Sequence, residues 1–258
     1  MSNLLTVAHL SCAYGRQEIV HDANLSVGKG EFCALLGLNG CGKTTLIKSI
    51  CGLLPITQGQ CFVNEENCTH MNERQRALRM SYIPQRGSPL FGKSVLDVVL
   101  MGYHARLQLL GSPGEKCRKQ ALETLEHLGL QDFARHDYAT LSEGQKQLVI
   151  LARTLVQDAP VMLMDEPDSA LDFVNRTMVL DQVRNVLQEQ GKAGLIALHD
   201  PNFAMAYCDR LLLMKNGTIA QELTLENASR EEVGAALSQI YGEIRVLEHQ
   251  GRFVMVHA

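Results

Sequence analysis

The stretch FCALLGLNGCGKTT, residues 32–45, decides the fold of this chain. Its first five residues are apolar and predict a buried strand, and Gly37–Thr44 then fits the phosphate-binding pattern G-x-x-x-x-G-K-[ST] where a helix opens. The glycines let backbone N–H groups close around phosphate oxygens, Lys43 supplies a positive charge for the outer phosphates, and the Thr44 hydroxyl can ligate Mg²⁺. The alternative is a glycine-rich strand-to-helix turn, but a turn alone does not require the Lys-Thr ending.

A second apolar run, VMLMDE at residues 161–166, ends in two carboxylates. A nucleotide-hydrolysing site needs a carboxylate for its metal ion, and Asp165 is the candidate. Glu166 follows at the carboxyl end of the predicted strand, where a doubly wound sheet places ligands, and can accept a proton from an attacking water. A solvated loop is the alternative for an isolated Asp-Glu pair, but the phosphate loop upstream favours the functional interpretation.

A histidine, His199, ends a third apolar run, GLIALHD at residues 194–200. We expect it near the same edge of the sheet, in contact with the terminal phosphate or the water. A structural role is an equally good interpretation of a single histidine at this position.

A second phosphate motif lies in TLSEGQKQL, residues 140–148. Ser142 fits the N-cap of a helix and Gln145 its N3 position, which together predict a capping box ahead of the apolar run LVILARTL. Free backbone N–H groups and the positive end of the helix dipole make this helix start attractive to an anion. One chain therefore carries two phosphate motifs, about a hundred residues apart.

The composition predicts a globular chain without nucleic acid as its main ligand. Of 258 residues, 46% are hydrophobic, and the net charge of −4 lacks the basic excess of a nucleic-acid surface. The eight cysteines form no C-x-x-C pair, so we expect neither zinc nor a disulfide framework, and a reducing cytosol fits best. We find no signal peptide and no apolar run near the roughly 20 residues that cross a bilayer, so any membrane role is expected to act through a partner.

The order of predicted elements indicates an α/β fold. Residues 4–36 show strands with glycines at the joints, and the helix that starts in the phosphate loop is expected to end at Pro55. Residues 87–138 have helical spacing and are interpreted as a helical insertion. After residue 139 strands and helices alternate, which predicts a parallel sheet wrapped by helices, and the tail adds a capped helix and a hairpin around Gln250-Gly251.

Together these motifs resemble those of the ATP-binding subunits of ATP-binding-cassette (ABC) transporters over nearly the whole chain. The matching segments follow the family's order: GLNGCGKTT (Walker A), Gln85 in SYIPQ (Q-loop), LSEGQ (signature), VMLMDEP (Walker B), SALD at residues 169–172 (D-loop) and His199 (switch). The resemblance implies a P-loop NTPase parallel-sheet core, an N-terminal antiparallel β subdomain and an inserted α-helical subdomain. It implies one ABC ATPase domain over residues 1–258: catalytic core with β subdomain in 1–86 and 139–222, helical insertion in 87–138 continuing into the signature helix, and C-terminal helix and hairpin in 223–258.

The resemblance also implies an ATPase that uses ATP and Mg²⁺ and pairs head to tail with a second copy, so that the signature of one copy faces the γ-phosphate held by the other. The implied catalytic residues are Glu166, His199 and Lys43, and the implied metal ligands are Thr44, Gln85 and Asp165. The implied nucleotide-binding residues are Tyr14, Gly37, Leu38, Asn39, Gly40, Cys41, Gly42, Lys43, Thr44, Thr45, Gln85, Ser142, Glu143, Gly144 and Gln145. Among these Tyr14 is expected to stack on adenine, and its alternative is a turn tyrosine packed on the first sheet. Gln85 is expected to bind Mg²⁺ or the water and to link the nucleotide to the helical insertion.

Two residues depart from the family pattern and add negative charge near the phosphates. Glu143 stands where LSGGQ has glycine, and Asp168 stands where DEPTS has threonine. Glu143 suits a helix N-terminus by about 0.3–1 kcal/mol, but it repels ATP unless its side chain points away. Glu143→Gly is therefore predicted to lower the ATP concentration that dimerisation needs.

The helical insertion and the tail resemble the importer branch for metal chelates, with iron–siderophore first and haem, corrinoid or molybdate as further cargoes. Generic helix and hairpin filler is the alternative. This branch implies transmembrane permease subunits, an indirect extracytoplasmic substrate-binding protein, and a peripheral position on the cytoplasmic face of the plasma (inner) membrane. The exposed apolar residues around Leu90–Met101 are expected to form part of the groove for a permease coupling helix. Other importers, an exporter, a soluble cassette ATPase of DNA repair or translation, and a non-catalytic binding module are the alternatives.

Overall fold

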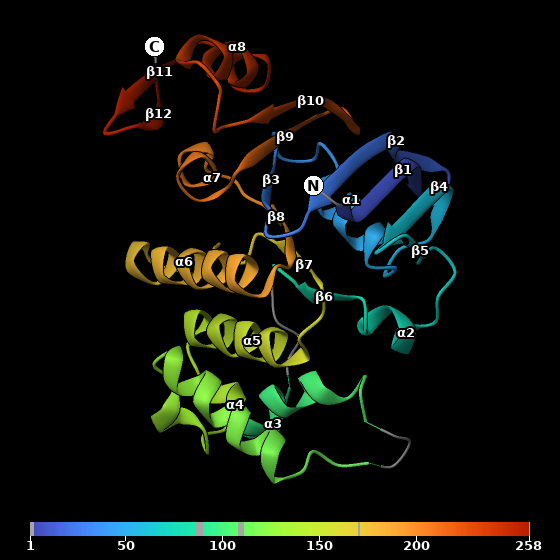
Figure 1. Ribbon diagram of the computed structural model, residues 1–258, viewed down its shortest axis with the longest axis vertical. Coiled ribbons are helices and arrows are strands. Elements are labelled where there is room, and N and C mark those ends of the chain that lie inside the picture. The colour runs from blue at the N-terminus through green and yellow to red at the C-terminus, as the bar shows by residue number, and fades with distance from the viewer. Residues whose placement is uncertain (1–2, 86–89, 108–110, 170, 258) are drawn as a thin grey trace.

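A six-stranded sheet runs through the middle of the molecule, with strand order β10-β9-β3-β8-β7-β6 (Figure 1). The computed structural model describes residues 3–85, 90–107, 111–169 and 171–257. The strands are β3 (Phe32–Leu36), β6 (Met80–Ile83), β7 (Val161–Asp165), β8 (Ala193–Ala197), β9 (Arg210–Lys215) and β10 (Thr218–Thr224). All neighbours are parallel except β9 and β10, which pair antiparallel at one edge. The carboxyl ends of β3, β7 and β8 therefore lie together, and the candidate site is built there.

Helices alternate with the strands of this sheet, and the predicted α/β class is confirmed. They are α1 (Lys43–Ile50), α5 (Glu143–Gln157), α6 (Phe173–Gln190) and α7 (Pro201–Tyr207). The predicted end of α1 at Pro55 is wrong, since the helix ends at Ile50. Gly52 follows with a φ of 73°, a left-handed conformation that glycine adopts freely and that stops a helix.

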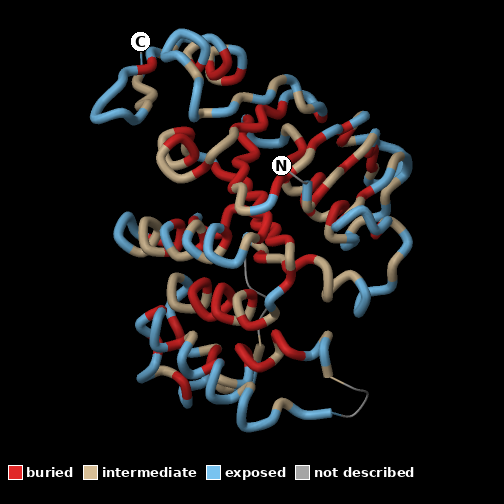
Figure 2. The backbone as a smooth tube through the Cα atoms, in the orientation of Figure 1, coloured by how far each residue is buried: buried red, intermediate tan, exposed pale blue. Residues whose placement is uncertain are grey.

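The central strand β3 separates two hydrophobic cores. Phe32, Ala34 and Leu36 pack with side chains of the helical region, α5, α6, α7 and the C-terminal helix. The alternate residues Cys33 and Leu35 pack on the other side, with α1 and the N-terminal strands. All of β3 is buried, and Figure 2 shows this continuous buried centre.

The N-terminal strands form a second sheet with order β2-β1-β4-β5. Its members are β1 (Asn3–Tyr14), β2 (Gln17–Gly28), β4 (Ile56–Val63) and β5 (Glu66–Asn67), all paired antiparallel. Tyr14 and Gln17 close the hairpin between β1 and β2, with Gly15 at a φ of 62° in the turn. The β-rich start predicted from residues 4–36 is therefore confirmed.

The segment before α5 is mostly helical and contains α2 (Glu73–Ala77), α3 (Val95–Leu100), a 3₁₀ turn (Met101–Tyr103), α4 (Glu115–His127) and 3₁₀ turns at Gln131–Phe133 and Tyr138–Thr140. The expectation of exposed apolar residues around Leu90–Met101 is mostly wrong. The buried ones are Val95, Val98, Val99 and Leu100, which pack in the same cluster as α4 and α5. Phe91 alone in this stretch is strongly exposed, at 78%. Residues 87–89 and 108–110 of the predicted insertion lie outside the described residues.

The C-terminal part contains α8 (Arg230–Tyr241) and a hairpin of β11 (Ile244–His249) and β12 (Arg252–His257). Both elements were predicted and are confirmed. Ser229 caps α8 in a capping box with Glu232, and Gln250 and Gly251 both have positive φ, as a tight hairpin turn requires. Below we call α8 and this hairpin the C-terminal unit.

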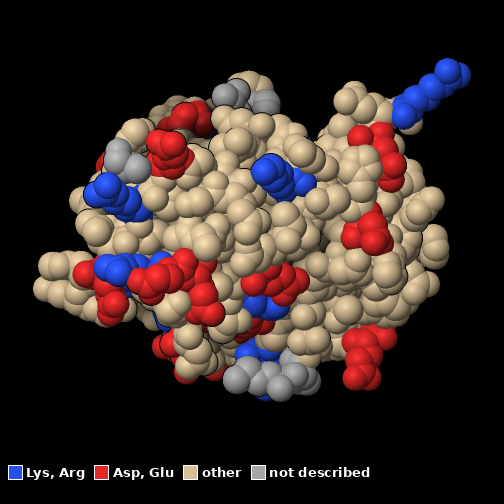
Figure 3. Space-filling view, turned by 90° about the horizontal axis from the view of Figure 1, so that it is seen from above, with Lys and Arg blue, Asp and Glu red and all other residues tan. Residues whose placement is uncertain are grey.

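Charged side chains are interspersed on the face seen from above in Figure 3. Lys and Arg, and Asp and Glu, occur there as separate small groups among other residues, and neither sign covers the face. Within the described parts of the chain, no helix combines the length and the hydropathy needed to cross a membrane.

Candidate active site

The phosphate loop joins the buried end of β3 to the first turn of α1. Gly42 stands before the helix with a φ of 111°, and Lys43 is the first helical residue. Leu38, Asn39 and Gly40 are exposed at the loop surface. Lys43 is only 5% exposed, and its Nζ donates a hydrogen bond of 2.8 Å to the carbonyl oxygen of Gly37. The ammonium group is therefore held over the loop, where it can meet phosphate oxygens.

Gly37 is packed too closely to carry a side chain. A Cβ atom there would lie 2.4 Å from the carbonyl oxygen of Met214 and 2.6 Å from Sγ of Cys41. The loop is also tied to the turn between β9 and β10, because the amide of Gly217 donates to the carbonyl of Cys41 at 3.0 Å. The back of the loop is thus fixed by β9 while its front stays exposed.

Thr44 and Asp165 form the candidate Mg²⁺ site. Thr44 Oγ1 donates to Asp165 Oδ1 at 2.8 Å, and Tyr82 lies 3.4 Å from the other carboxylate oxygen. Asp165 is 1% exposed, and burial raises its pKa while the hydrogen bond from Thr44 lowers it. One hydroxyl and one carboxylate fit Mg²⁺, which uses few protein oxygens and completes its shell with phosphate and water.

Glu166 lies next to two other predicted site residues. Its Oε2 accepts a hydrogen bond of 2.5 Å from Nε2 of Gln85 and lies 2.6 Å from Nε2 of His199. Among the described residues no hydrogen bond or ion pair is made to the other oxygen, Oε1. Glu166 is 5% exposed, and its φ of 51° is a conformation that costs a non-glycine residue about 1–2 kcal/mol. The structure therefore brings these three residues together and leaves Oε1 able to accept a proton.

Asp168, one of the two departures from the family pattern, is neutralised within the chain. It is buried, and its Oδ2 lies 3.2 Å from Nε of Arg176 on α6. Burial raises the pKa of Asp168, and the Arg176 charge opposes that rise. The Arg176 guanidinium also lies over the Phe203 ring, 4.9 Å from its centroid. The extra charge is thus balanced by Arg176 within the chain.

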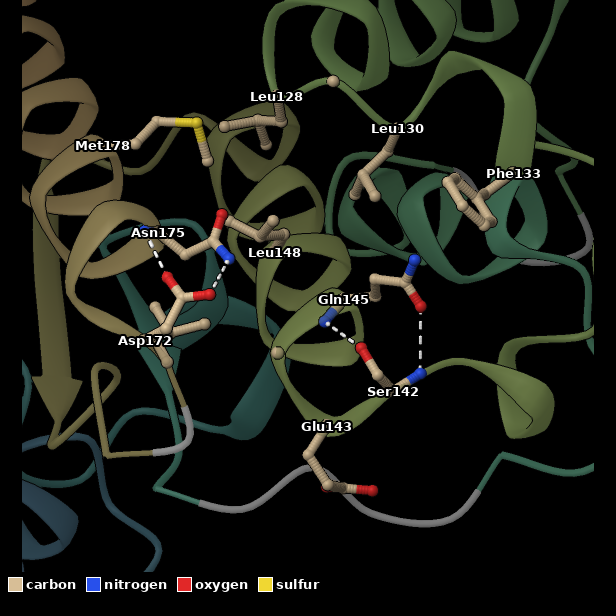
Figure 4. A pocket seen from close by; sticks show the side chains of 13 residues that line it. Leu128, Leu130, Phe133, Ser142, Glu143, Gln145, Leu148, Asp172, Asn175 and Met178 are labelled. Atoms are coloured by element: carbon tan, nitrogen blue, oxygen red, sulfur yellow. Dashed lines mark hydrogen bonds between the residues drawn. The ribbon is translucent and has the colours of Figure 1, made fainter.

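The second phosphate motif has the predicted capping box. Ser142 Oγ accepts a hydrogen bond from the Gln145 amide at 3.2 Å, and Gln145 Oε1 accepts one from the Ser142 amide at 3.0 Å (Figure 4). Glu143 is 70% exposed, is paired with Lys146 at 2.8 Å, and points away from the box in Figure 4. The box lines a cavity of about 650 Å³, with Asp172 and Asn175 across from it and Leu128, Leu130 and Leu148 also in the lining.

The predicted site residues therefore fall into two groups. The phosphate loop, Asp165, Glu166, Gln85 and His199 meet at the ends of β3, β7 and β8. In the described residues, no hydrogen bond or ion pair joins residues 142–145 to that group, and the cavity that residues 142–145 line does not include the phosphate loop. Tyr14 is 49% exposed at the end of β1, so its ring is accessible, and adenine stacking stays a prediction.

Sequence reasoning missed Arg176, Tyr82 and the Asp172–Asn175 pair, which is joined at 2.8 Å as the N-cap of α6. The N-cap pattern of Asp172 ahead of a helix was visible in the sequence. For Arg176 no sequence signal existed, because its contact with Asp168 depends on how α6 leaves the loop after Glu166.

Comparisons with known proteins agree with this geometry. The ABC transporter family matches residues 20–169. An uncharacterized ABC transporter ATP-binding protein of Bacillus subtilis is 33% identical over 93% of the chain, and the chain spans 54% of its length. The manganese transport system ATP-binding protein of Bacillus subtilis is 34% identical, over 86% of this chain and 89% of that protein. The petrobactin import ATP-binding protein of Bacillus anthracis is 32% identical, over 85% of this chain and 80% of that protein.

Solved structures share the whole fold. An inward-facing metal-chelate type ABC transporter is 27% identical with a TM-score of 0.81, covering 99% of this chain and 97% of that chain. A bacterial ABC transporter cassette solved as a dimer is 26% identical with a TM-score of 0.78, covering 87% of this chain and 100% of that chain. The same cassette is known in a post-hydrolysis dimer with ADP and phosphate bound.

Proposed function

Because this chain belongs to the ABC transporter family, as an ATP-binding subunit and ATPase, we propose that it drives an importer for metal chelates. Two copies pair head to tail, and each ATP lies between the phosphate loop of one copy and residues 142–145 of the other. Closure of the pair on ATP and its release after hydrolysis move the permease subunits.

The separation of the two phosphate motifs carries this proposal. The capping hydrogen bonds join Ser142 and Gln145 to each other, and residues 142–145 line a cavity of about 650 Å³. Among the described residues, they make no hydrogen bond or ion pair to Lys43 or Glu166. A helix start with free amides that serves no phosphate of its own chain is suited to the phosphate of a second copy. The related cassette that was solved as a dimer supports the pairing of two copies.

Each residue of the first group has a role in hydrolysis. Lys43 leaves its bond to Gly37 and binds the β- and γ-phosphates, while loop amides hold the remaining oxygens. Thr44 and Asp165 hold Mg²⁺, which neutralises charge on the phosphates when bound. Phosphoryl transfer is mainly positioning and charge stabilisation, so the protein has little covalent chemistry to perform.

Glu166 acts as general base through its Oε1 atom. Gln85 and His199 hold the other carboxylate oxygen at 2.5 and 2.6 Å, which fixes the direction of Oε1. A water between Oε1 and the γ-phosphate then loses its proton to Glu166 as it attacks. We assign His199 to orienting Glu166 as well as to the γ-phosphate, because its imidazole already contacts that carboxylate.

Partners and cargo are proposed from the relatives. One relative imports petrobactin and one solved neighbour is a metal-chelate type transporter, which favours a chelated metal, with iron–siderophore first. The manganese relative makes a free divalent metal ion the second candidate. Phe91, exposed beside partly exposed Leu90 and Leu96, is the apolar surface that we assign to a permease coupling helix. That contact would place the chain at the cytoplasmic face of the membrane.

The test of the catalytic and dimer assignments is a Glu166→Gln variant. Loss of a general base lowers turnover by about 10²–10⁴-fold, while every phosphate contact remains, so the variant should trap ATP. Light scattering with MgATP should then report twice the mass of one chain, and Lys43→Ala, with the same carboxylate but no phosphate contact, should stay monomeric. Near-normal turnover of Glu166→Gln, or a monomer at saturating MgATP, would contradict the proposal.

The cargo is tested in the complex with its permease. ATP turnover should rise when binding protein loaded with a ferric siderophore is added, and manganese or zinc salts should leave it unchanged. Stimulation by manganese alone would move the assignment to the second candidate. An ATPase active without any membrane partner, and indifferent to all cargoes, would favour a soluble cassette.

A further inference from the structure

The end of α8 lies beside the phosphate loop, across a cavity that both line. Ile240 lines a cavity of about 370 Å³ together with Leu38, Asn39, Gly40 and Cys41 of the loop. Lys215, at the end of β9, donates from Nζ to the carbonyl oxygen of Gln239 at 2.9 Å. Tyr241 is the last residue of α8 and follows directly. The end of α8 therefore lies near both the phosphate loop and the end of β9.

The Tyr241 hydroxyl is buried and has no hydrogen-bond partner of good geometry among the described residues. Burial is the main reason that its pKa is raised to about 12, and the neighbouring Cys41 and Asp200 add to that rise. The Gly37 backbone lowers the Tyr241 pKa, because a hydrogen-bond donor near the oxygen favours its charged form. The Gly37 backbone and Asp200, the residue that follows His199, are therefore both near enough to the hydroxyl to affect its pKa.

A second contact joins the C-terminal unit to α7, which begins two residues after His199. Asp200 caps α7, accepting from the Asn202 amide at 2.9 Å. The Asn202 side chain then makes two hydrogen bonds to the backbone of Met255 in β12, at 2.7 and 3.2 Å. The C-terminal unit therefore lies beside the phosphate loop and is bonded to the start of α7, which follows His199.

We propose that Tyr241 is a positioning residue for ATP binding: its hydroxyl oxygen accepts a hydrogen bond from the Gly37 amide when the phosphate loop closes on nucleotide. A Cβ atom at Gly37 would overlap Met214 and Cys41, so the loop is closely packed at its start, and a contact on the Gly37 amide would add to what holds it there. Gly37 is also the residue whose carbonyl holds Lys43. The inference rests on the proposed function, because the loop must bind ATP for Tyr241 to matter.

The test is Tyr241→Phe, which removes the hydroxyl and keeps the ring. A lost hydrogen bond of ordinary net strength should raise the Kd and KM for MgATP by about 2- to 10-fold, with saturated kcat within about twofold. Thermal stability should stay equal or rise, because the hydroxyl lacks a good partner in the structure. A merely structural tyrosine would instead lower stability together with activity.

Tyr138→Phe is the matched control. Its hydroxyl is also buried without a partner among the described residues, but it lies in a 3₁₀ turn of the helical segment. Affinity for MgATP should be unchanged in this variant. An unchanged Kd in Tyr241→Phe, an equal loss in Tyr138→Phe, or a drop in melting temperature that accompanies the weaker binding would overturn the inference. Wild-type chain that fails to bind ATP would instead refute the proposed function itself.

Discussion

The ion pair between Asp168 and Arg176 gives a prediction with a magnitude that can be worked from the structure. The Asp168 side chain is 6% exposed and that of Arg176 is 24% exposed, so the two partners differ in access to water. Arg176→Met keeps volume and contact with the Phe203 ring but leaves the Asp168 carboxylate buried without a counter-charge. Asp168→Asn instead leaves the Arg176 guanidinium, which is more exposed to water, without its counter-charge.

The two changes should therefore cost different amounts. Removing one partner of a fully buried pair costs about 3–5 kcal/mol, and the partial exposure of Arg176 reduces this to about 2–4 kcal/mol for Arg176→Met. Asp168→Asn should cost less than about 1 kcal/mol, because the unpaired guanidinium can reach water and keeps its contact with Phe203. The double variant should recover most of the loss of Arg176→Met, since the buried charge is then absent.

The pH dependence has a definite sign. Burial already raises the pKa of Asp168 in the folded chain, and loss of Arg176 raises it further. A raised carboxyl pKa favours folding below the unfolded pKa and opposes it as pH rises through the folded pKa. The deficit of Arg176→Met relative to wild type should therefore be full at neutral pH and shrink as pH falls toward about 4.

The assay is urea denaturation of the four proteins, wild type, two single variants and the double variant, at neutral and acidic pH. The free energy of unfolding is compared at equal m-values, so that changes in the midpoint report stability. Equal losses in the two single variants, or a deficit of Arg176→Met that grows as pH falls, would refute this account of the pair.

Three further predictions concern the nucleotide site. In a Glu166→Gln background, Glu143→Gly should lower the ATP concentration for half-maximal dimerisation. The decrease should be less than about fivefold, because Glu143 is exposed and paired with Lys146. Light scattering over an ATP series measures this concentration, and an increase would count against the prediction. Thr44→Ala should raise the Mg²⁺ concentration for half-maximal turnover by about 10- to 100-fold, and an unchanged Mg²⁺ titration would remove Thr44 from the metal site. His199→Ala should lower kcat by about 100-fold, and normal kcat would reduce His199 to a structural contact.

Much of the site could be predicted from the chain because its residues follow apolar strands. Asp165 ends a buried strand, Glu166 follows it directly, and Lys43 lies one loop after another buried strand. The carboxyl ends of parallel strands meet at one edge of a sheet, so these residues are expected to lie close together. The capping box at Ser142 was predicted equally well, since its hydrogen bonds join residues three apart. A sequence pattern is therefore sufficient to predict a contact when the two residues are close in sequence, or when the order of the sheet brings their strands together.

Contacts between distant elements could not be predicted where neither a local pattern nor the order of the sheet brings the residues together. Nothing local indicates that Arg176 reaches Asp168, or that Tyr241 reaches the phosphate loop some two hundred residues earlier. The apolar residues around Leu90–Met101 were expected at the surface, yet α3 packs most of them against α4 and α5. An amphipathic pattern shows that a helix has an apolar face but does not show which neighbour covers it. The strand β10 was missed because alternate exposed residues gave it a polar appearance.

The composite site is tested most directly by mixing two inactive variants. Lys43→Ala spoils the phosphate loop and leaves residues 142–145 intact, whereas Ser142→Arg blocks that helix start and leaves the loop, Asp165 and Glu166 intact. Each variant alone should lack ATP turnover. When an equal mixture is assembled on the permease subunits, which would hold two copies together without ATP, it should recover about a quarter of wild-type turnover, because half of the pairs are mixed and each has one complete site of two. Turnover by Ser142→Arg alone, or a mixture no more active than its components, would contradict a site built from two chains.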